Sequence, residues 1–430
     1  MIRIPTYALG IVVLFAAAWV TSLWRAELIA RASSTVAGYQ QALAWNPESD
    51  EYHAVLGTAF RDLLDGQDLD AAVRELRAAV RIRPMVWTHH ESLAITLEIK
   101  GDPDGAEAEF NEELRLNPHH TQLRWQAANF FLRRGNLELA LEHFRAAAEF
   151  DPSRLAPAAD RLTAAGATVE QIGAGLVPQR RPDLMAYLYF VLDRLPAEPE
   201  RAFRLAWNTW LRWEQAPRVG AFHIGSLDRF MTFLLRHGEY EKARQVWNSG
   251  LQDALGPASS EDYGTNGGHA GPAPGTEAVY NGGFEAEALN GGFDWTLPAH
   301  PEVYYEYDHQ TRYQGLTSLR IDFAGKSNLN YSGPRQVLLL PAGKLQLRFI
   351  ARSENVTSDQ GVCFELRSFA GNTLLARSAP ILGNSPWQLR TAEFEVERPT
   401  AAVLTLRRYP SEKFNNLLGG RLWLDAVEIR

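Results

Sequence analysis

Residues 117–152 read NPHHTQLRWQAANFFLRRGNLELALEHFRAAAEFDP, and this stretch decides how the first half of the chain folds. Proline closes an apolar helical pattern at both of its ends, after Asn117 and after Asp151. The same closure occurs at Asn46-Pro47 and Arg83-Pro84, so the intervals are 37, 34 and 34 residues (84 − 47, 118 − 84, 152 − 118). A period of 34 residues that ends in proline predicts a repeated pair of antiparallel helices.

Small and large residues recur at fixed places within these units. They include a glycine between the helices, an alanine early in the second helix and an aromatic residue after it: Gly101, Ala106 and Phe110 in one unit, Gly135, Ala140 and Phe144 in the next. Small residues let paired helices approach closely, and one pair cannot bury its apolar face alone, so units must stack. On these residues the chain resembles the tetratricopeptide repeat family, clearly over 48–152 and in degenerate form over a helical solenoid from 34 to 255.

The resemblance implies a binding surface for another protein. In this family the inner face of the first helix of each unit binds peptide or protein segments, and the corresponding residues here are Arg61, Glu91, Glu98, Gln122, Trp125 and Asn129. Trp125 is the sharpest candidate because aromatic side chains dominate binding energy at interfaces. Two alternatives stay open: Trp125 packs against a neighbouring helix, and the charged positions form an ordinary solvated face.

The amino terminus predicts a membrane anchor over residues 1–33. No charged residue occurs from Tyr7 to Trp24, a length at the short end of what spans a bilayer, with Arg3 before it and Arg25 after it. The alternative is a signal peptide cleaved at Ala30-Arg31-Ala32. We expect an uncleaved single-pass helix in a bacterial inner membrane, with the bulk of the chain in the periplasm.

The composition changes abruptly at residues 256–276, which are rich in Gly, Pro, Ser and Asn and predict a flexible linker. After it, over 277–430, polar and apolar residues alternate, as in Ser318–Phe323 and Lys344–Phe349. Many short alternating segments with Gly and Pro between them predict a β-sandwich, most plausibly a jelly roll. The predicted fold class is therefore multidomain: a transmembrane helix, an all-α solenoid and an all-β jelly-roll sandwich.

Several motifs of the C-terminal domain occur in a characteristic order. Asn281–Glu285 opens the domain, Phe293–Trp295 follows, and Leu424–Val427 lies near its end. In this order they resemble the jelly rolls of carbohydrate-binding modules. The resemblance implies a structural calcium ion held by Glu285 and Asp425 with carbonyl groups near Thr317; the alternative is a pair of exposed carboxylates. It also implies sugar stacking on aromatic residues, some of which a sandwich needs in its core: Trp295, Tyr305, Tyr307, Tyr313, Tyr331, Trp387 and Tyr409.

Charge and motifs exclude several classes of function. The formal net charge of −8 argues against general nucleic-acid binding, and the single cysteine, Cys363, excludes internal disulfides and thiolate metal clusters. Cys363 sits in a segment that predicts a buried strand. No His-Glu-x-x-His zinc motif and no Gly-x-Ser-x-Gly nucleophile motif occurs. We therefore expect a protein without catalytic activity.

These features together predict a membrane-anchored scaffold. Its repeats would bind a protein partner and its sandwich would contact glycan, in the assembly or export of cell-surface polysaccharide. A pure protein–protein adaptor without sugar binding is the first alternative and predicts no exposed aromatic cluster on the sandwich. An enzyme with a site between solenoid and sandwich is the second.

Overall fold

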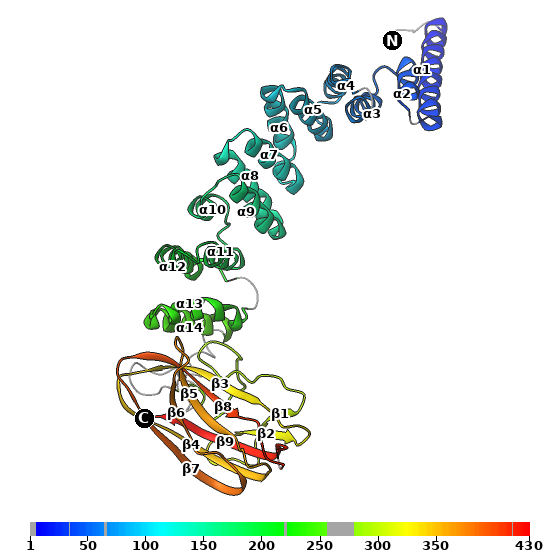
Figure 1. Ribbon diagram of the computed structural model, residues 1–430. Coiled ribbons are helices and arrows are strands. Elements are labelled where there is room, and N and C mark those ends of the chain that lie inside the picture. The colour runs from blue at the N-terminus through cyan, green and yellow to red at the C-terminus, as the bar shows by residue number, and fades with distance from the viewer. Residues whose placement is uncertain (1–5, 34, 64–66, 219–221, 256–278, 415) are drawn as a thin grey trace, which may run out of the picture. The chain divides into compact units, whose positions relative to one another are not determined.

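The computed structural model describes residues 6–33, 35–63, 67–218, 222–255, 279–414 and 416–430. The chain forms two compact units, Met1–Trp213 and Glu214–Arg430. Helices dominate the first unit, and two β-sheets dominate the second (Figure 1). The predicted order of a helical repeat region followed by a β-sheet region is confirmed.

The first unit consists of helices joined by short turns. They are α1 (Thr6–Ala32), α2 (Val36–Trp45), α3 (Asp50–Asp62), α4 (Leu69–Ile82), α5 (Trp87–Lys100), α6 (Pro103–Leu116), α7 (Thr121–Arg133), α8 (Leu137–Phe150), the 3-10 turn η1 (Pro152–Arg154), α9 (Leu155–Ala164), α10 (Val169–Gly175), α11 (Arg181–Arg194) and α12 (Pro199–Gln215). In Figure 1, α3 with α4, α5 with α6 and α7 with α8 form successive hairpins, as the 34-residue period predicts.

Local chemistry explains these hairpins. Gly101 and Gly135 take left-handed φ angles of +86° and +76° after the first helices, a conformation that glycine adopts without strain. The next residues, Asp102 and Asn136, cap the second helices, because their side chains accept the amide hydrogens of Gly105 and Leu139 at 3.0 and 3.2 Å. The alanines early in the second helices are fully buried, at Ala72, Ala106 and Ala140.

Helix α1 has two different parts. Its C-terminal part packs on α2 and α3, where Ala26 and Ala30 lie in one buried cluster with Ala42 and Tyr52. The tyrosine hydroxyl donates a hydrogen bond of 2.7 Å to Glu27. The remainder carries exposed apolar residues such as Leu14, Phe15 and Trp19. Within the described residues, 11–32 is the segment long and apolar enough to cross a bilayer, a property that signal sequences share.

The second unit joins a helical hairpin to two antiparallel sheets. Its helices are the 3-10 turn η2 (Ile224–Leu227), α13 (Asp228–Arg236) and α14 (Tyr240–Leu255). Its strands are β1 (Val303–Asp308), β2 (Ser318–Ala324), β3 (Tyr331–Leu340), β4 (Gly343–Val356), β5 (Cys363–Ser368), β6 (Leu374–Arg377), β7 (Gly383–Val396), β8 (Thr400–Arg408) and β9 (Gly419–Ile429). One sheet has the order β1-β2-β9-β4-β7 and the other β3-β8-β5-β6.

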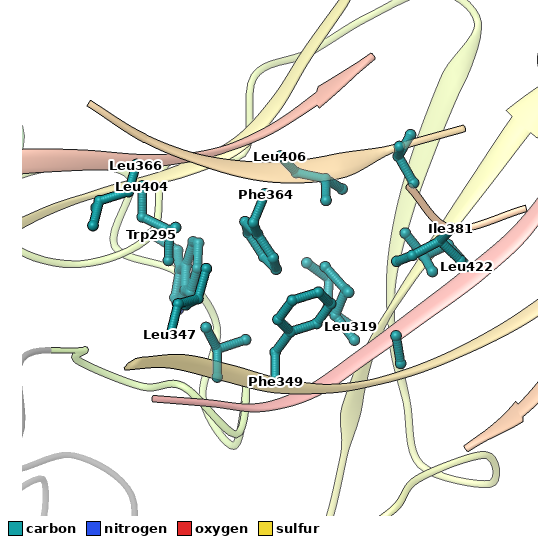
Figure 2. Close-up of a cluster of buried hydrophobic side chains, with 14 of the residues drawn as sticks. Trp295, Leu319, Leu347, Phe349, Phe364, Leu366, Ile381, Leu404, Leu406 and Leu422 are labelled. Carbon is teal, nitrogen blue, oxygen red and sulfur yellow. The ribbon is translucent and has the colours of Figure 1, made fainter. Parts of the chain in front are cut away.

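The two sheets enclose one apolar core. Figure 2 shows Leu347, Phe349 and Leu422 from the five-stranded sheet facing Phe364 and Leu404 from the four-stranded sheet. Most chain connections cross from one sheet to the other, so consecutive strands close over the same core. The alternating segments predicted from the sequence therefore form a two-sheet sandwich.

The compact units divide the chain at a different place from the predicted domains. Helices α13 and α14 belong to the same unit as the sandwich, because Trp247 of α14 packs edge-on against Tyr280 and Phe293 with ring centroids 5.9 and 6.2 Å apart. The predicted linker, 256–276, lies outside the described residues. The predicted domain boundaries at 33/34, 255/256 and 276/277 stay predictions.

One repeat position departs from the pattern. Ala79 and Ala147 are fully buried near the ends of α4 and α8. Glu113 of α6 occupies the equivalent position of the repeat between them, 34 residues from each alanine (79 + 34 and 147 − 34). Glu113 is buried, and neither of its carboxyl oxygens has a hydrogen-bond partner among the described residues. Burial, with a smaller contribution from Glu91, raises the pKa of Glu113 to about 8. The carboxyl group therefore holds a proton in the folded repeat at neutral pH.

We predict that Glu113 makes the repeats less stable as pH rises. Its folded pKa exceeds the unfolded value, so its contribution is most favourable below pH 4.5 and is lost as pH rises towards 8, by on the order of 1 kcal/mol per pH unit. Glu113→Gln keeps the shape of the neutral acid and removes this loss. Thermal unfolding at pH 5 and pH 8, followed by circular dichroism, measures the difference between variant and parent.

The matched control is Glu138→Gln on the exposed surface of α8. We expect the control to follow the pH dependence of the parent. Identical pH dependence of Glu113→Gln and the parent would show that the buried carboxyl group does not titrate in this range.

Candidate functional site

Polar pairs connect the first helices of successive repeats. Arg133 of α7 donates two hydrogen bonds to Glu98 of α5, at 2.7 and 2.8 Å. Arg161 of α9 donates to Asn129 of α7 at 3.0 Å, and Arg194 of α11 donates to Asp160 of α9 at 2.7 Å. The predicted residues Glu98 and Asn129 therefore lie where neighbouring first helices face one another. The predicted residue Gln122 joins them through a hydrogen bond of 3.4 Å from Arg154.

Trp125 lies at the centre of this row and is half-buried. Its ring packs edge-on against Phe144, with centroids 4.8 Å apart. The guanidinium groups of Arg154 and Arg161 lie over the ring, 5.0 and 5.4 Å from its centroid. One edge of the ring therefore packs on the paired helix α8 while arginines cover its face, and the role of Trp125 in partner binding stays a prediction.

Two other predicted residues do not join the row. Arg61 pairs with its own neighbour Asp62 on α3, at 2.7 Å. Glu91 of α5 is half-buried, and its charge acts on the buried Glu113. Sequence spacing placed both residues on the first helices, but their side chains form contacts of their own.

Sequence reasoning missed an apolar cavity of about 300 Å³ between α9, α10 and α11. Leu155 and Ala159 of α9 form one wall, and Ala186 and Phe190 of α11 form another. Asp183 supplies a polar group at its lining and accepts a 2.5 Å hydrogen bond from Arg180. Residues 155 and 159 are four apart on α9, and residues 186 and 190 are four apart on α11, so each pair shares one helix face. This spacing was a usable signal of an apolar face on each helix.

In the sandwich, Glu285 and Asp425 hold the same loop, which connects β1 to β2. Asp425 is fully buried and accepts the amide hydrogens of Tyr313 and Gln314 at 2.9 and 3.1 Å. The carboxylate of Glu285 accepts the amide hydrogen of Leu316 at 2.8 Å. Burial raises the pKa of Asp425, and the nearby charge of Glu285 raises it further, against the effect of these hydrogen bonds.

The loop is shaped closely around Glu285. A Cβ atom on Gly315 would overlap Oε1 of Glu285, and Gly315 has a φ of +66°. Thr317 is buried and donates a hydrogen bond to the carbonyl group of Phe284. The predicted carboxylate pair is therefore brought together beside the 313–317 backbone. Among the described residues no group of three or more His, Cys, Asp or Glu side chains is arranged around a common point.

The structure separates the aromatic candidates into core and surface residues. Trp295 and Tyr331 are buried in the sandwich core, where a sugar ring cannot reach them. Tyr305 and Tyr307 pack against that core, and their hydroxyl groups bond to Tyr331 and to the amide of Ala288. These four side chains are part of the packing that holds the two sheets together.

Two candidates meet at the surface. Tyr313, 54% exposed, and the half-buried Trp387 of β7 lie with ring centroids 6.1 Å apart. Because Asp425 binds the amide of Tyr313, the buried carboxylate positions this ring. Tyr409 stands apart from them at the end of β8, where its hydroxyl donates to Glu365 at 3.0 Å. Cys363 is buried in β5, as predicted, and burial raises the pKa of its thiol.

The tetratricopeptide repeat family profile matches residues 58–121 and 100–154. With the hairpin geometry described above, these matches identify residues 58–154 as tetratricopeptide repeats. None of the curated proteins compared with the chain matches it.

Solved structures resemble separate parts of the chain. A thermophilic TPR protein of Thermus thermophilus is 25% identical, with 30% of this chain and 70% of that one covered, at a TM-score of 0.27. YrrB, described as a TPR protein with an unusual peptide-binding site, is 19% identical over 44% of this chain and 90% of its own, at a TM-score of 0.30. The CBM22-1 xylan-binding domain of Xyn10C from Paenibacillus barcinonensis is 15% identical over 32% and 84%, at a TM-score of 0.24.

Proposed function

We propose that this chain is a membrane-anchored, non-catalytic scaffold that binds a protein partner through its repeats and glycan through its sandwich. The setting is the periplasmic side of a bacterial inner membrane, in assembly or export of cell-surface polysaccharide. The observation that carries the partner-binding half is the apolar cavity between α9, α10 and α11. The arginines over Trp125 are close to it in sequence, Arg161 on α9 and Arg154 in the preceding turn η1.

The chemistry of this surface selects a kind of partner. A cavity of about 300 Å³ accepts one apolar side chain with good shape complementarity. Among the described residues, the partners of Arg154 and Arg161 are the neutral groups of Gln122, Asn129 and the Trp125 ring, apart from the 3.3 Å pair of Arg154 with Asp151. A carboxylate on the partner forms a stronger, charge-assisted bond than these neutral acceptors do. The preferred partner segment therefore carries an apolar anchor beside acidic residues.

Glycan binding is supported by the surface pair of Tyr313 and Trp387. Adjacent exposed aromatic rings offer apolar faces on which the C–H face of a pyranose can stack. The pure adaptor alternative expects no such cluster, so the pair favours the glycan-binding alternative. The contrast with the buried Trp295 leaves Tyr313 and Trp387 as the residues for this role.

Calcium at Glu285 and Asp425 is supported by the donor set around the Gly315 turn. Two carboxylates whose charges repel each other become favourable neighbours when a divalent cation lies between them. Calcium accepts carboxylate oxygens, and Glu285 and Asp425 present theirs beside the 313–317 backbone. Bound calcium would supply a fixed charge that holds the loop of Tyr313 in place.

The membrane anchor is supported by the two parts of α1. The exposed apolar part suits a bilayer, while Ala26 and Ala30 are buried by α2 and α3. Cleavage at Ala30-Arg31-Ala32 would remove the residues that cover Ala42 and Tyr52, which argues for retention of the helix.

We predict that peptides selected from a random display library against the full chain in detergent share an aliphatic or aromatic anchor flanked by Asp or Glu. Ala156→Trp fills the cavity and weakens such peptides at least tenfold, because the anchor is excluded. Trp125→Ala, which removes the ring below the arginines, has a similar effect. Fluorescence polarisation with a selected peptide measures both changes.

The control for peptide binding is Ala146→Trp on α8, whose side chain does not line the cavity. Unchanged affinity of Ala156→Trp, in a variant with parental circular dichroism, would contradict the assignment of the cavity to the partner.

We predict that xylan or another neutral polysaccharide binds the full chain through Tyr313 and Trp387, and that calcium strengthens this binding by ordering the loop. Calorimetric titration of a polysaccharide panel, with calcium or with a chelator, measures affinity. Tyr313→Ala or Trp387→Ala weakens binding at least fivefold, since each stacked ring contributes about 1 kcal/mol or more. Asp425→Asn removes the calcium effect.

Tyr304→Ala is the matched control, because Tyr304 is 62% exposed on β1 and outside the pair. Binding that Tyr304→Ala and Tyr313→Ala reduce equally would contradict the assignment of the glycan to the Tyr313–Trp387 pair. A well-folded chain that binds no polysaccharide in the panel would favour the pure adaptor.

We predict that the full chain stays in the membrane fraction after alkaline carbonate extraction and that its N-terminal residue is Met1 or the residue following it. Replacing Leu14 and Phe15 by Asp releases the protein, because a charged residue within a spanning helix is costly. Release of the unaltered chain, or an N-terminus beyond Ala32 by mass spectrometry, would establish a cleaved signal sequence instead.

A further inference from the structure

Arginine residues gather on the outer face of the four-stranded sheet, the face turned away from the apolar core. The register aligns Arg335 of β3, Thr405 of β8, Glu365 of β5 and Arg377 of β6 in one row across all four strands. The inward neighbours Leu404, Leu406 and Phe364 fill the core, so the row faces outward. Arg367 lies two residues along β5 on the same side.

Glu365 is the buried centre of this cluster. Only 2% of its side chain is exposed, and its carboxylate pairs with Arg367 at 3.0 Å and with Arg377 at 2.5 Å. Tyr409 donates to the same carboxylate, and its ring lies under the guanidinium groups of Arg377 and Arg407 at 5.3 and 4.9 Å. One carboxylate thus fixes two arginines and one aromatic ring in place.

The cluster carries excess positive charge on an acidic chain. Four arginines (335, 367, 377 and 407) lie on this face, and two of them, Arg367 and Arg377, pair with the carboxylate of Glu365, whereas the whole chain has a formal net charge of −8. Among the described residues Arg407 forms no ion pair and bonds to the amide oxygen of Asn330 at 3.2 Å. Arg335 is exposed and likewise forms no ion pair there; Asp228 of α13 acts on it only at longer range.

The row has the dimensions of a polymer site. Neighbouring strands lie about 4.8 Å apart, so three strand intervals separate Arg335 from Arg377 by roughly 14 Å. A single small anion cannot reach both ends of such a row, but a chain of anions can. At the Arg335 end the face meets α13 across a cavity of about 260 Å³, which is lined by Val337 and Val403 on the sheet and by Asp228 and Met231 on the helix.

We propose that this arginine face binds an acidic polysaccharide whose anionic groups are carboxylates, such as a polymer of uronic acids. The planar guanidinium group matches a carboxylate with two parallel hydrogen bonds. Tyr409, 36% exposed, offers a ring edge for a sugar beside two of these groups. The choice of glycan as the polymer rests on the proposed function, but the surface is separate from the Tyr313–Trp387 pair, which lies on the five-stranded sheet and its loop.

Other polyanions fit less well. An extended peptide gains most of its affinity from main-chain hydrogen bonds at a strand edge, and the face of a sheet offers none. Nucleic acid requires many neutralised phosphates, and the acidic remainder of the chain opposes it.

The test uses the full chain in detergent and polygalacturonate as the probe, followed by calorimetry at low and physiological salt. Arg335→Gln/Arg407→Gln removes two guanidinium groups that form no ion pair among the described residues, so the sandwich keeps its packing. We expect this double variant to bind about 100-fold more weakly, at about tenfold for each charge-assisted contact. Methyl-esterified polygalacturonate, which has the same backbone without the charges, is expected to bind the parent more weakly than polygalacturonate does and no more tightly than it binds the double variant.

The matched control is Lys344→Gln/Arg421→Gln, which removes the same charge from exposed positions of the five-stranded sheet. We expect it to change affinity by less than threefold. Absence of polygalacturonate binding, equal binding by the Arg335→Gln/Arg407→Gln variant, or equal binding of the methyl ester overturns the proposal. Polyglutamate that binds as tightly through the same arginines assigns the surface to acidic peptides and overturns it too.

Tyr313→Ala separates this proposal from the proposed function. If Tyr313→Ala abolishes polygalacturonate binding and the arginine double variant retains it, the ligand binds at the aromatic pair. That result overturns the proposal for the arginine face and leaves the proposed function standing. If Tyr313→Ala loses neutral-glycan binding but retains polygalacturonate binding, the two ligands bind at two distinct surfaces, as proposed.

Discussion

Close approach of paired helices at small residues is the constraint on which the helical unit depends. Ala72, Ala106 and Ala140 are fully buried where each second helix meets its neighbours. At Gly57 an added Cβ atom would lie 2.7 Å from Leu76, so even a methyl group would force these two helices apart. Because every hairpin closes in the same way, the first helices come into register, and side chains 32 to 35 residues apart pair across them. The binding row is thus a geometric consequence of core packing.

In the sandwich a polar contact has the corresponding role. The sheets are held together by apolar packing, which fixes the strands but leaves the long β1–β2 loop without a core of its own. Asp425, on the central strand β9, supplies the hydrogen-bond acceptors for the backbone amides of this loop. Because its carboxyl group is buried, it would lower the stability of the fold if those hydrogen bonds did not form. The orientation of Tyr313 at the surface therefore depends on a carboxylate in the interior.

The sequence was informative wherever periodicity decided the structure. Proline and glycine marked the hairpins, and alternation marked the strands, because helix and strand periods are local properties. It was less informative where contacts depend on loop paths. Alternation could not tell that Trp295 fills the core while Tyr313 meets Trp387 of β7 at the surface, because Trp295 and Tyr313 lie in loops, whose residues follow no period. The cavity of α9 to α11 was missed because those units depart from the repeat pattern that locates the groove. Glu365 was missed because a glutamate in an apolar strand gives no sign of which arginines surround it.

The same placement of charge occurs in both units. An acidic chain is repelled by acidic ligands at long range, so binding such ligands requires local arginine groups that outweigh this repulsion at contact distance. Both proposed surfaces have that character: Arg154 and Arg161 cover Trp125, and Arg377 and Arg407 cover Tyr409. An arginine stacked on an aromatic ring keeps its in-plane hydrogens available, because the ring occupies only the face of the guanidinium group. The stacked pair is therefore oriented before a carboxylate arrives, which lowers the entropy cost of binding it.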